Sequence, residues 1–134
     1  MTYAEGRSKT KKSKKDRVQA LRSRQEQMKI FREICPIKPN YTVPHTNIAI
    51  KNYFYEEYGC RCWLCGEIFP RNELTLHHVI PYHISQRTNV EESSIVCCHC
   101  HFDIVNKIPY NSEEYWSVMK QMYNNIKQWN KESL

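Results

Sequence analysis

Four cysteines arranged as two Cys-x-x-Cys pairs are the residues whose type and spacing most directly predict chemistry in this sequence. The first pair is Cys62 and Cys65, the second is Cys97 and Cys100, and 31 residues lie between the pairs. The turn within each pair brings its two sulfurs together, and two such pairs complete a tetrahedral thiolate shell that suits zinc. Gly66, directly after the first pair, fits the sharp backbone turn of a zinc knuckle. We therefore predict a structural zinc site with no open coordination position.

Three further cysteines leave open which four cysteines bind the ion. Cys98 adjoins Cys97 and is an alternative ligand, although it would leave a Cys-x-Cys pair, which makes a poorer knuckle. Cys35 and Cys60 are expected to be free thiols. An iron–sulfur cluster is the alternative on ligand type alone, but a basic protein with no other redox motif favours zinc.

Five of the six histidines fall between residues 77 and 101, inside or directly after the cysteine pairs. Neighbouring side chains of a strand point to opposite faces, so His77 can bind an ion while His78 faces another partner. His101 follows the second cysteine pair at the start of a predicted helix. If that helix packs against the strand, His77 and His101 could meet at one ion, and His78 would be left to handle a proton near neutral pH.

Simpler roles are open for several of these residues. His99 is expected to hydrogen-bond a thiolate or to be exposed, and His101 has the same alternative of supporting the zinc site. His83 is either a further metal or phosphate contact or an exposed polar residue. Asn106, one turn beyond His101, could supplement a metal site or only bond at the end of its helix.

The elements that must position these residues alternate between helices and short strands. Residues 1–15 are predicted to be disordered because they combine low hydrophobicity with high charge. We expect a helix over 16–34 with Val18, Leu21, Met28, Phe31 and Ile34 on its apolar face, and an extended proline-containing connector over 35–46. A helix over 47–58, capped by Asn47 and ended by Gly59, is expected next, with Ile48, Tyr53, Phe54 and Tyr58 among its apolar positions. The remaining elements are a knuckle over 60–66, strands at 74–79 and 95–96, and a helix over 100–107.

A last helix closes the chain. Asn111 and Glu114 resemble a capping box at its start. An apolar stripe follows, which predicts packing on the core, with a dimer interface as the alternative. Its members are Tyr115, Val118, Met119, Met122, Ile126 and Trp129.

Composition and charge restrict the class of protein. The 134 residues fit one domain with an appendage, and no apolar run approaches the roughly 18 residues of a membrane span. The N-terminus lacks the apolar stretch of a signal peptide, so we expect a soluble protein in the reducing cytoplasm, where seven cysteines favour metal over disulfides.

The positive charge is concentrated at the N-terminus. Residues 1–33 carry eleven Lys or Arg against four acids, whereas residues 34–134 carry nine against ten. Such a basic segment attracts phosphates, but a localisation signal or a solubilising tail has the same composition. The candidate nucleic-acid contacts are Lys9, Lys11, Lys12, Lys14, Lys15, Arg17, Arg22, Arg24 and, by charge and position, Arg87.

The order of these motifs resembles a known enzyme family. The segments CWLCG (62–66), LTLHHVIPYH (74–83) and IVCCHCHFDIVNK (95–107) resemble HNH endonucleases of the zinc-knuckle type, which are ββα-metal nucleases, and IKNYFYEEYGCRC (50–62) is similar to the helix before their first knuckle. The resemblance covers residues 47–108. It implies an α+β fold with a small ββα-metal, treble-clef-like core at 47–108. The basic arm at 1–46 and the amphipathic helix at 109–134 lie outside the resemblance.

The resemblance also implies roles for single residues. His77 and His101 would bind a catalytic divalent metal, Mg²⁺ or another ion, and His78 would be the general base that activates water against a phosphodiester. The family's middle asparagine stands five residues before the second cysteine pair, where this chain has Glu92. Asn89 could serve if the loop is re-registered, or Glu92 could accept a hydrogen bond from His78.

We therefore expect a metal-dependent DNA endonuclease or nickase that is located at DNA. Small nucleases of this kind are found in phages and mobile elements. For protein partners, a homodimer and a larger phage or mobile-element machinery are both open. The alternative function is a non-catalytic zinc-binding module that docks on nucleic acid or protein, and a zinc hydrolase of small molecules is a third.

Overall fold

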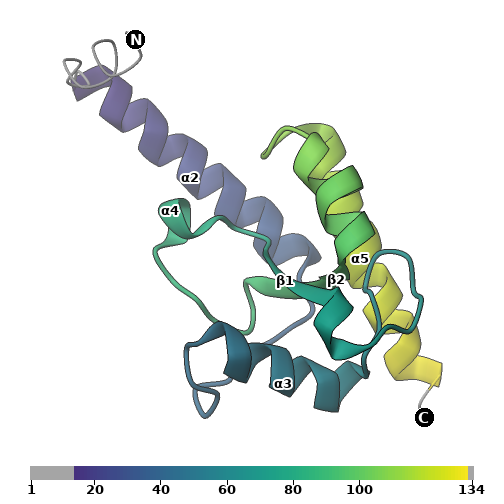
Figure 1. The fold of residues 1–134 in the computed structure, drawn as a ribbon. Helices are drawn as coiled ribbons and strands as arrows, with labels where there is room; N and C mark the ends of the chain where they lie inside the picture. Colours follow the sequence, from purple (N-terminus) through teal and green to yellow (C-terminus); the bar gives the residue numbers. More distant parts are fainter. Residues whose placement is uncertain (1–13, 133–134) are drawn as a thin grey trace, which may run out of the picture.

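The computed structural model describes residues 14–132, with side chains described from residue 24 to residue 129. Three long helices surround a short antiparallel hairpin (Figure 1). The helices are α2 (Lys14–Ile34), α3 (Asn47–Tyr58) and α5 (Glu113–Glu132), and the strands are β1 (Leu74–His78) and β2 (Ser93–Cys97). Short helical turns complete the fold: η1 (Arg71–Glu73), α4 (Tyr82–Ser85), η2 (Cys100–Ile104) and η3 (Val105–Lys107). The predicted mixture of helix and strand is confirmed.

The hairpin carries the histidine doublet. Strand β1 pairs with β2 from Leu74 opposite Cys97 to His78 opposite Ser93. Every residue of β2 is buried: the strand packs against α3, and the Trp63 amide of the first knuckle donates a hydrogen bond of 2.9 Å to the Ile95 carbonyl. The two predicted strands are therefore confirmed, and β2 is longer than its two apolar residues alone indicated.

Helix α3 matches its predicted bounds, but its first turn differs from the prediction. Thr46 is the N-cap instead of Asn47: its backbone is extended, and its hydroxyl accepts a hydrogen bond of 3.2 Å from the Ala49 amide. Ile48, expected on the apolar face, is 75% exposed, because the helix turns Ile50 and Phe54 into the core. Gly59 ends the helix at φ 82°, a left-handed conformation that favours glycine.

Helix α5 also begins differently from its predicted capping box. The Ser112 hydroxyl accepts a hydrogen bond from the Tyr115 amide, so Ser112 is the cap. Asn111 is instead a left-handed residue at φ 69° whose side-chain oxygen accepts from the Trp116 indole. The predicted apolar stripe is confirmed, with Met119, Met122 and Ile126 fully buried.

Helix α2 begins at Lys14, so the predicted disorder is wrong for residues 14 and 15, and its prediction for residues 1–13 lies outside the described residues. Phe31 is buried against the core, as predicted, and Met28 and Ile34 are partly buried. The side chains of the other two predicted apolar positions, Val18 and Leu21, lie outside the described residues.

The segment predicted as a helix over 100–107 is helical but not a regular α-helix. It begins as the wide π-helical turn η2 and tightens into the 3₁₀ turn η3, where the Val105 amide reaches the carbonyls of Cys100 and His101. Such wide turns are rare and occur mainly at functional sites. Among residues 14–132, no helix combines the length and apolarity of a membrane span.

Candidate functional site

The four predicted zinc ligands come together in one cluster. The sulfurs of Cys62, Cys65, Cys97 and Cys100 all lie within 4.8 Å of one another, and all but Cys65 are buried. We call these four residues the four-cysteine cluster. Cys98, the alternative ligand, is exposed and outside it.

Backbone hydrogen bonds prepare both halves of this cluster for metal. The Cys65 amide donates to the Cys62 sulfur and the Cys100 amide to the Cys97 sulfur, each at 3.4 Å. Burial alone would raise the pKa of Cys62, but hydrogen bonds from backbone amides, that of Cys65 first, lower it, whereas burial raises the pKa of Cys65 and of Cys100. Gly66 turns the first knuckle at φ 78°. Four sulfurs this close together fit a tetrahedral ion, so the cluster could hold a metal such as zinc.

Helix α5 holds the first knuckle from outside. The Asn125 side-chain amide donates to the carbonyls of Trp63 at 2.9 Å and Leu64 at 3.2 Å. The Arg61 guanidinium donates to the Gly66 carbonyl at 2.8 Å and lies 4.0 Å from the centre of the Trp129 ring. The last helix, outside the segment of family resemblance, is therefore part of the support of the cluster.

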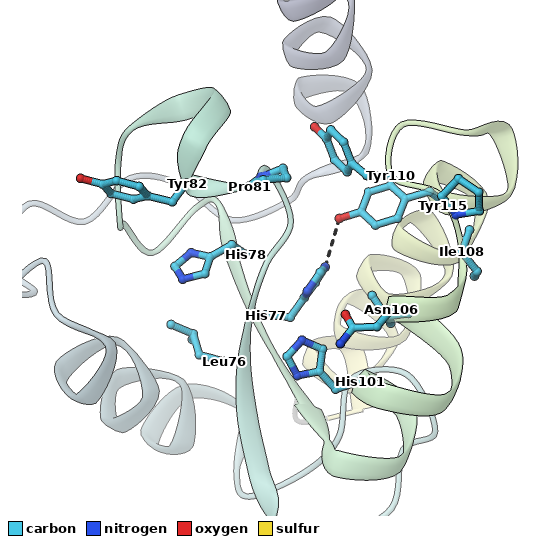
Figure 2. Close-up of a pocket in the computed structure, with 12 residues that line it drawn as sticks. Leu76, His77, His78, Pro81, Tyr82, His101, Asn106, Ile108, Tyr110 and Tyr115 are labelled. Atoms are coloured by element: carbon cyan, nitrogen blue, oxygen red, sulfur yellow. Dashed lines mark hydrogen bonds between the residues drawn. The ribbon is translucent and has the colours of Figure 1, made fainter. Parts of the chain in front are cut away.

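A second, open site lies beside the hairpin. A pocket of about 530 Å³ is lined by all three predicted functional histidines, and we call it the histidine pocket. His77 on β1 and His101 on η2 approach each other with ring centres 5.3 Å apart, while His78 lines the pocket from the other side of β1 (Figure 2). Asn106 is exposed and borders the pocket beside the two rings.

Two hydroxyl groups bind the paired imidazoles. The Tyr115 hydroxyl lies 3.0 Å from Nε2 of His77 and donates to the Val79 carbonyl at 2.6 Å. The Thr75 hydroxyl lies 2.8 Å from Nδ1 of His101 and donates to the Val96 carbonyl at 3.0 Å. Sequence reasoning missed both: Tyr115 was assigned only to the apolar stripe, and Thr75 to no role. The signal for Tyr115 was its hydroxyl, since a buried tyrosine usually finds a polar partner.

Burial keeps these imidazoles neutral near neutral pH. It lowers the pKa of His77 to about 3, helped by the neighbouring His101 and His78, and burial likewise lowers the pKa of His101. Burial also lowers the pKa of His78, while the negative charge of Glu92 acts in the opposite direction. Neutral imidazole is the form that binds metal or accepts a proton.

The two candidates for the middle position lie away from this pocket and bind each other. Glu92 is 3% exposed, its carboxylate accepts from the Asn89 side chain at 3.3 Å, and Arg87 approaches at 3.9 Å. Asn89 also accepts from the Glu92 amide. The carboxylate therefore contacts Asn89 and Arg87, instead of making the predicted hydrogen bond with His78.

Two of the predicted nucleic-acid contacts share one surface groove. Arg24 and Arg87 are exposed and, together with Arg32, line a groove of about 310 Å³ between α2 and the α4 region. Lys14, Lys15, Arg17 and Arg22 lie on α2, but their side chains are outside the described residues, as are Lys9, Lys11 and Lys12 altogether.

Two other histidines lie outside the site. His83 is exposed, and His99 is exposed with its ring 2.9 Å from Asp103, so it supports no thiolate. Comparison with known proteins adds nothing to the geometry: no family model, no curated protein and no solved structure matches this chain.

Proposed function

We propose that this chain is a metal-dependent DNA endonuclease or nickase of the HNH, ββα-metal type. The observation that carries the proposal is the pair formed by His77 and His101, whose rings lie 5.3 Å apart in an open pocket that His78 also lines. One residue comes from a hairpin strand and the other from the helical turn that follows it, as the family resemblance implies. The pocket thus offers two neutral imidazoles beside a third that is free to exchange a proton.

The donor set of the pocket fits a divalent transition metal. Imidazole nitrogen suits ions such as Zn²⁺, Ni²⁺ and Co²⁺, whereas Mg²⁺ prefers oxygen ligands. Within the described residues, the four-cysteine cluster is the only group of three or more Cys, His, Asp or Glu ligands, so no carboxylate joins His77 and His101. An ion held by this pair would offset the negative charge that develops on the phosphate and on the leaving 3′ oxygen.

His78 is the proposed general base. Burial lowers its pKa, so its ring is neutral near neutral pH and can take a proton from water. Its ring makes no hydrogen bond to another described residue, and it lines the pocket near Tyr82 (Figure 2). The His78 ring is therefore available to accept a hydrogen bond from a water molecule that lies between it and a bound phosphodiester.

The four-cysteine cluster supports this chemistry by fixing the hairpin against η2. Cys97 is the last residue of β2, and Cys100 is the first residue of η2, directly before His101. Leu74, at the start of the strand that carries His77, pairs with Cys97. A zinc ion held by the cluster would thus fix the separation of the two metal-binding histidines.

The basic surface gives a reason to choose nucleic acid as the substrate. Helix α2 carries Arg24 and Arg32 in the groove with Arg87. The same helix is tied to the histidine pocket, because Tyr110 lines that pocket and donates a hydrogen bond of 2.7 Å to Gln27 of α2. A nucleic-acid backbone whose phosphates bind along α2 would therefore extend towards the histidine pocket. Contacts to phosphates would give the protein little specificity for the base sequence.

Plasmid cleavage tests the proposal. Zinc-loaded protein should nick supercoiled DNA with Mn²⁺, Co²⁺ or Ni²⁺ and more slowly with Mg²⁺, and His78→Ala should lower the rate by about 100-fold or more, because proton transfer by a positioned base contributes that much. His99→Ala is the matched control, since His99 is exposed, lies outside the histidine pocket and hydrogen-bonds to Asp103. Equal rates for wild type and His78→Ala would overturn the nuclease assignment, and DNA binding without cleavage under every ion would support the non-catalytic module.

A further inference from the structure

Each metal-binding histidine of the pocket has one ring nitrogen bound to a hydroxyl group that already uses its own proton elsewhere. This inference rests on the proposed function only in treating His77 and His101 as a metal site. A tyrosine or threonine hydroxyl has a single proton to donate, and it can accept at its oxygen at the same time. Which carbonyl or nitrogen receives that proton therefore decides the tautomer of the neighbouring imidazole.

The tyrosine pair has one consistent arrangement. The Tyr115 oxygen lies 2.6 Å from the Val79 carbonyl oxygen, a distance that two oxygens reach only with a proton between them. With its proton given to Val79, the hydroxyl can only accept from Nε2 of His77, 3.0 Å away (Figure 2). Nε2 of His77 must then carry the hydrogen, and Nδ1 keeps its lone pair.

The threonine pair follows the same logic on the other histidine, with the ring reversed. The Thr75 hydroxyl donates to the Val96 carbonyl at 3.0 Å and lies 2.8 Å from Nδ1 of His101. Both contacts are hydrogen bonds only if Nδ1 of His101 carries the hydrogen. Nε2 of His101 is then the nitrogen with a free lone pair.

We propose that Tyr115 and Thr75 are positioning residues that hold His77 and His101 in opposite tautomers, so that Nδ1 of His77 and Nε2 of His101 are the two atoms that bind the metal. Metal-binding histidines usually donate their other ring N–H to a fixed acceptor, which sets both the tautomer and the ring orientation. Here the acceptors are two hydroxyls, each anchored to the backbone at or next to the hairpin. The tyrosine reaches the site from α5, so the last helix contributes directly to it.

Nitrogen NMR on the zinc-loaded chain without a second metal reads the tautomers directly. At mildly alkaline pH we expect a protonated Nε2 for His77 and a protonated Nδ1 for His101. Tyr115→Phe should release His77 alone into a mixture of tautomers, and Thr75→Val should release His101 alone, while Thr75→Ser restores the wild-type state. Tyr110→Phe is the matched control, because this neighbouring tyrosine lines the same pocket but gives its hydroxyl to Gln27.

Binding of Ni²⁺ to the zinc-loaded protein gives a second readout that does not depend on cleavage. Tyr115→Phe and Thr75→Val should each weaken Ni²⁺ binding about tenfold, the lower end of the usual effect of removing such a partner, and Tyr110→Phe should not. A wild type with hydrogen on Nδ1 of His77 or on Nε2 of His101 would overturn the proposal, as would variants with wild-type tautomers and Ni²⁺ affinity. If the tautomers and the Ni²⁺ effects are as expected but no DNA is cleaved, the inference holds and the nuclease proposal fails.

Discussion

The four-cysteine cluster and the histidine pocket lie next to each other in the chain but are built in opposite ways. In the cluster, four sulfurs lie within 4.8 Å of one another, and two local turns provide all of them. In the pocket, the two paired rings come from β1 and η2, and their hydroxyl partners come from β1 and α5. The cluster leaves no position for a substrate, whereas the pocket is open over about 530 Å³.

The difference separates structural support from proposed chemistry. A closed set of thiolates satisfies one ion and stabilises the turns around it. An open pair of neutral imidazoles can bind an ion and still leave room for water and phosphate. Helix α5 connects the two sites, because Asn125 binds the first knuckle and Tyr115 binds His77.

Removing one cluster ligand should have the largest effect. Zinc bound by thiolates contributes on the order of 10 kcal/mol to the folding of small domains, which is comparable to the whole stability of a typical domain, about 5–15 kcal/mol. Cys97→Ser, or strong chelation of zinc from the wild type, should therefore abolish the cooperative thermal transition seen by circular dichroism. Cys98→Ser, one residue along and exposed, should melt like the wild type. If the Cys97→Ser protein still folds cooperatively, the cluster is not needed for the fold and the prediction is wrong.

Breaking the contact between α5 and the first knuckle should have a smaller effect. Asn125→Ala leaves the carbonyls of Trp63 and Leu64 without their side-chain donor. We expect a loss of about 1–3 kcal/mol in the free energy of unfolding by urea, the usual cost of unpaired buried polar groups. Asn124→Ala, on the exposed face of the same helix, should change it by less than about 0.5 kcal/mol. Equal stabilities for the two variants would show that α5 does not support the cluster through this contact.

Neutralising Glu92 should have the smallest effect on the histidine pocket. Burial lowers the pKa of His78 and the charge of Glu92 raises it, so Glu92→Gln should lower that pKa further. His78 would then stay neutral to lower pH, and the acid limb of the cleavage profile should move down by a fraction of a pH unit. NMR titration of His78 measures the shift, with Glu91→Gln as control. A rise in the pKa of His78 would contradict the electrostatic role of Glu92.

Patterns of local spacing made much of this protein predictable from its sequence. The cysteine pairs specified the cluster, since a Cys-x-x-Cys turn brings its two sulfurs together with little help from the rest of the fold, and the structure then placed Cys98 outside it. The apolar periodicity specified α5 and its buried face, and the strand of the histidine doublet was found within one residue. Each knuckle turn and each helical stripe depends on residues a few positions apart, whereas the meeting of the two knuckles, separated by 31 residues in the sequence, depends on the fold.

Only the tertiary structure decided which groups meet across long separations. It turned Ile48 outward, directed Glu92 towards Asn89 and Arg87, and brought the Tyr115 hydroxyl to His77 from 38 residues away. Periodicity shows that Tyr115 is buried but not which polar atom satisfies its hydroxyl, because that depends on how α5 packs against the end of β1. The sequence thus identified the candidate histidines, whereas the orientation of their rings follows from the packing of distant segments around them.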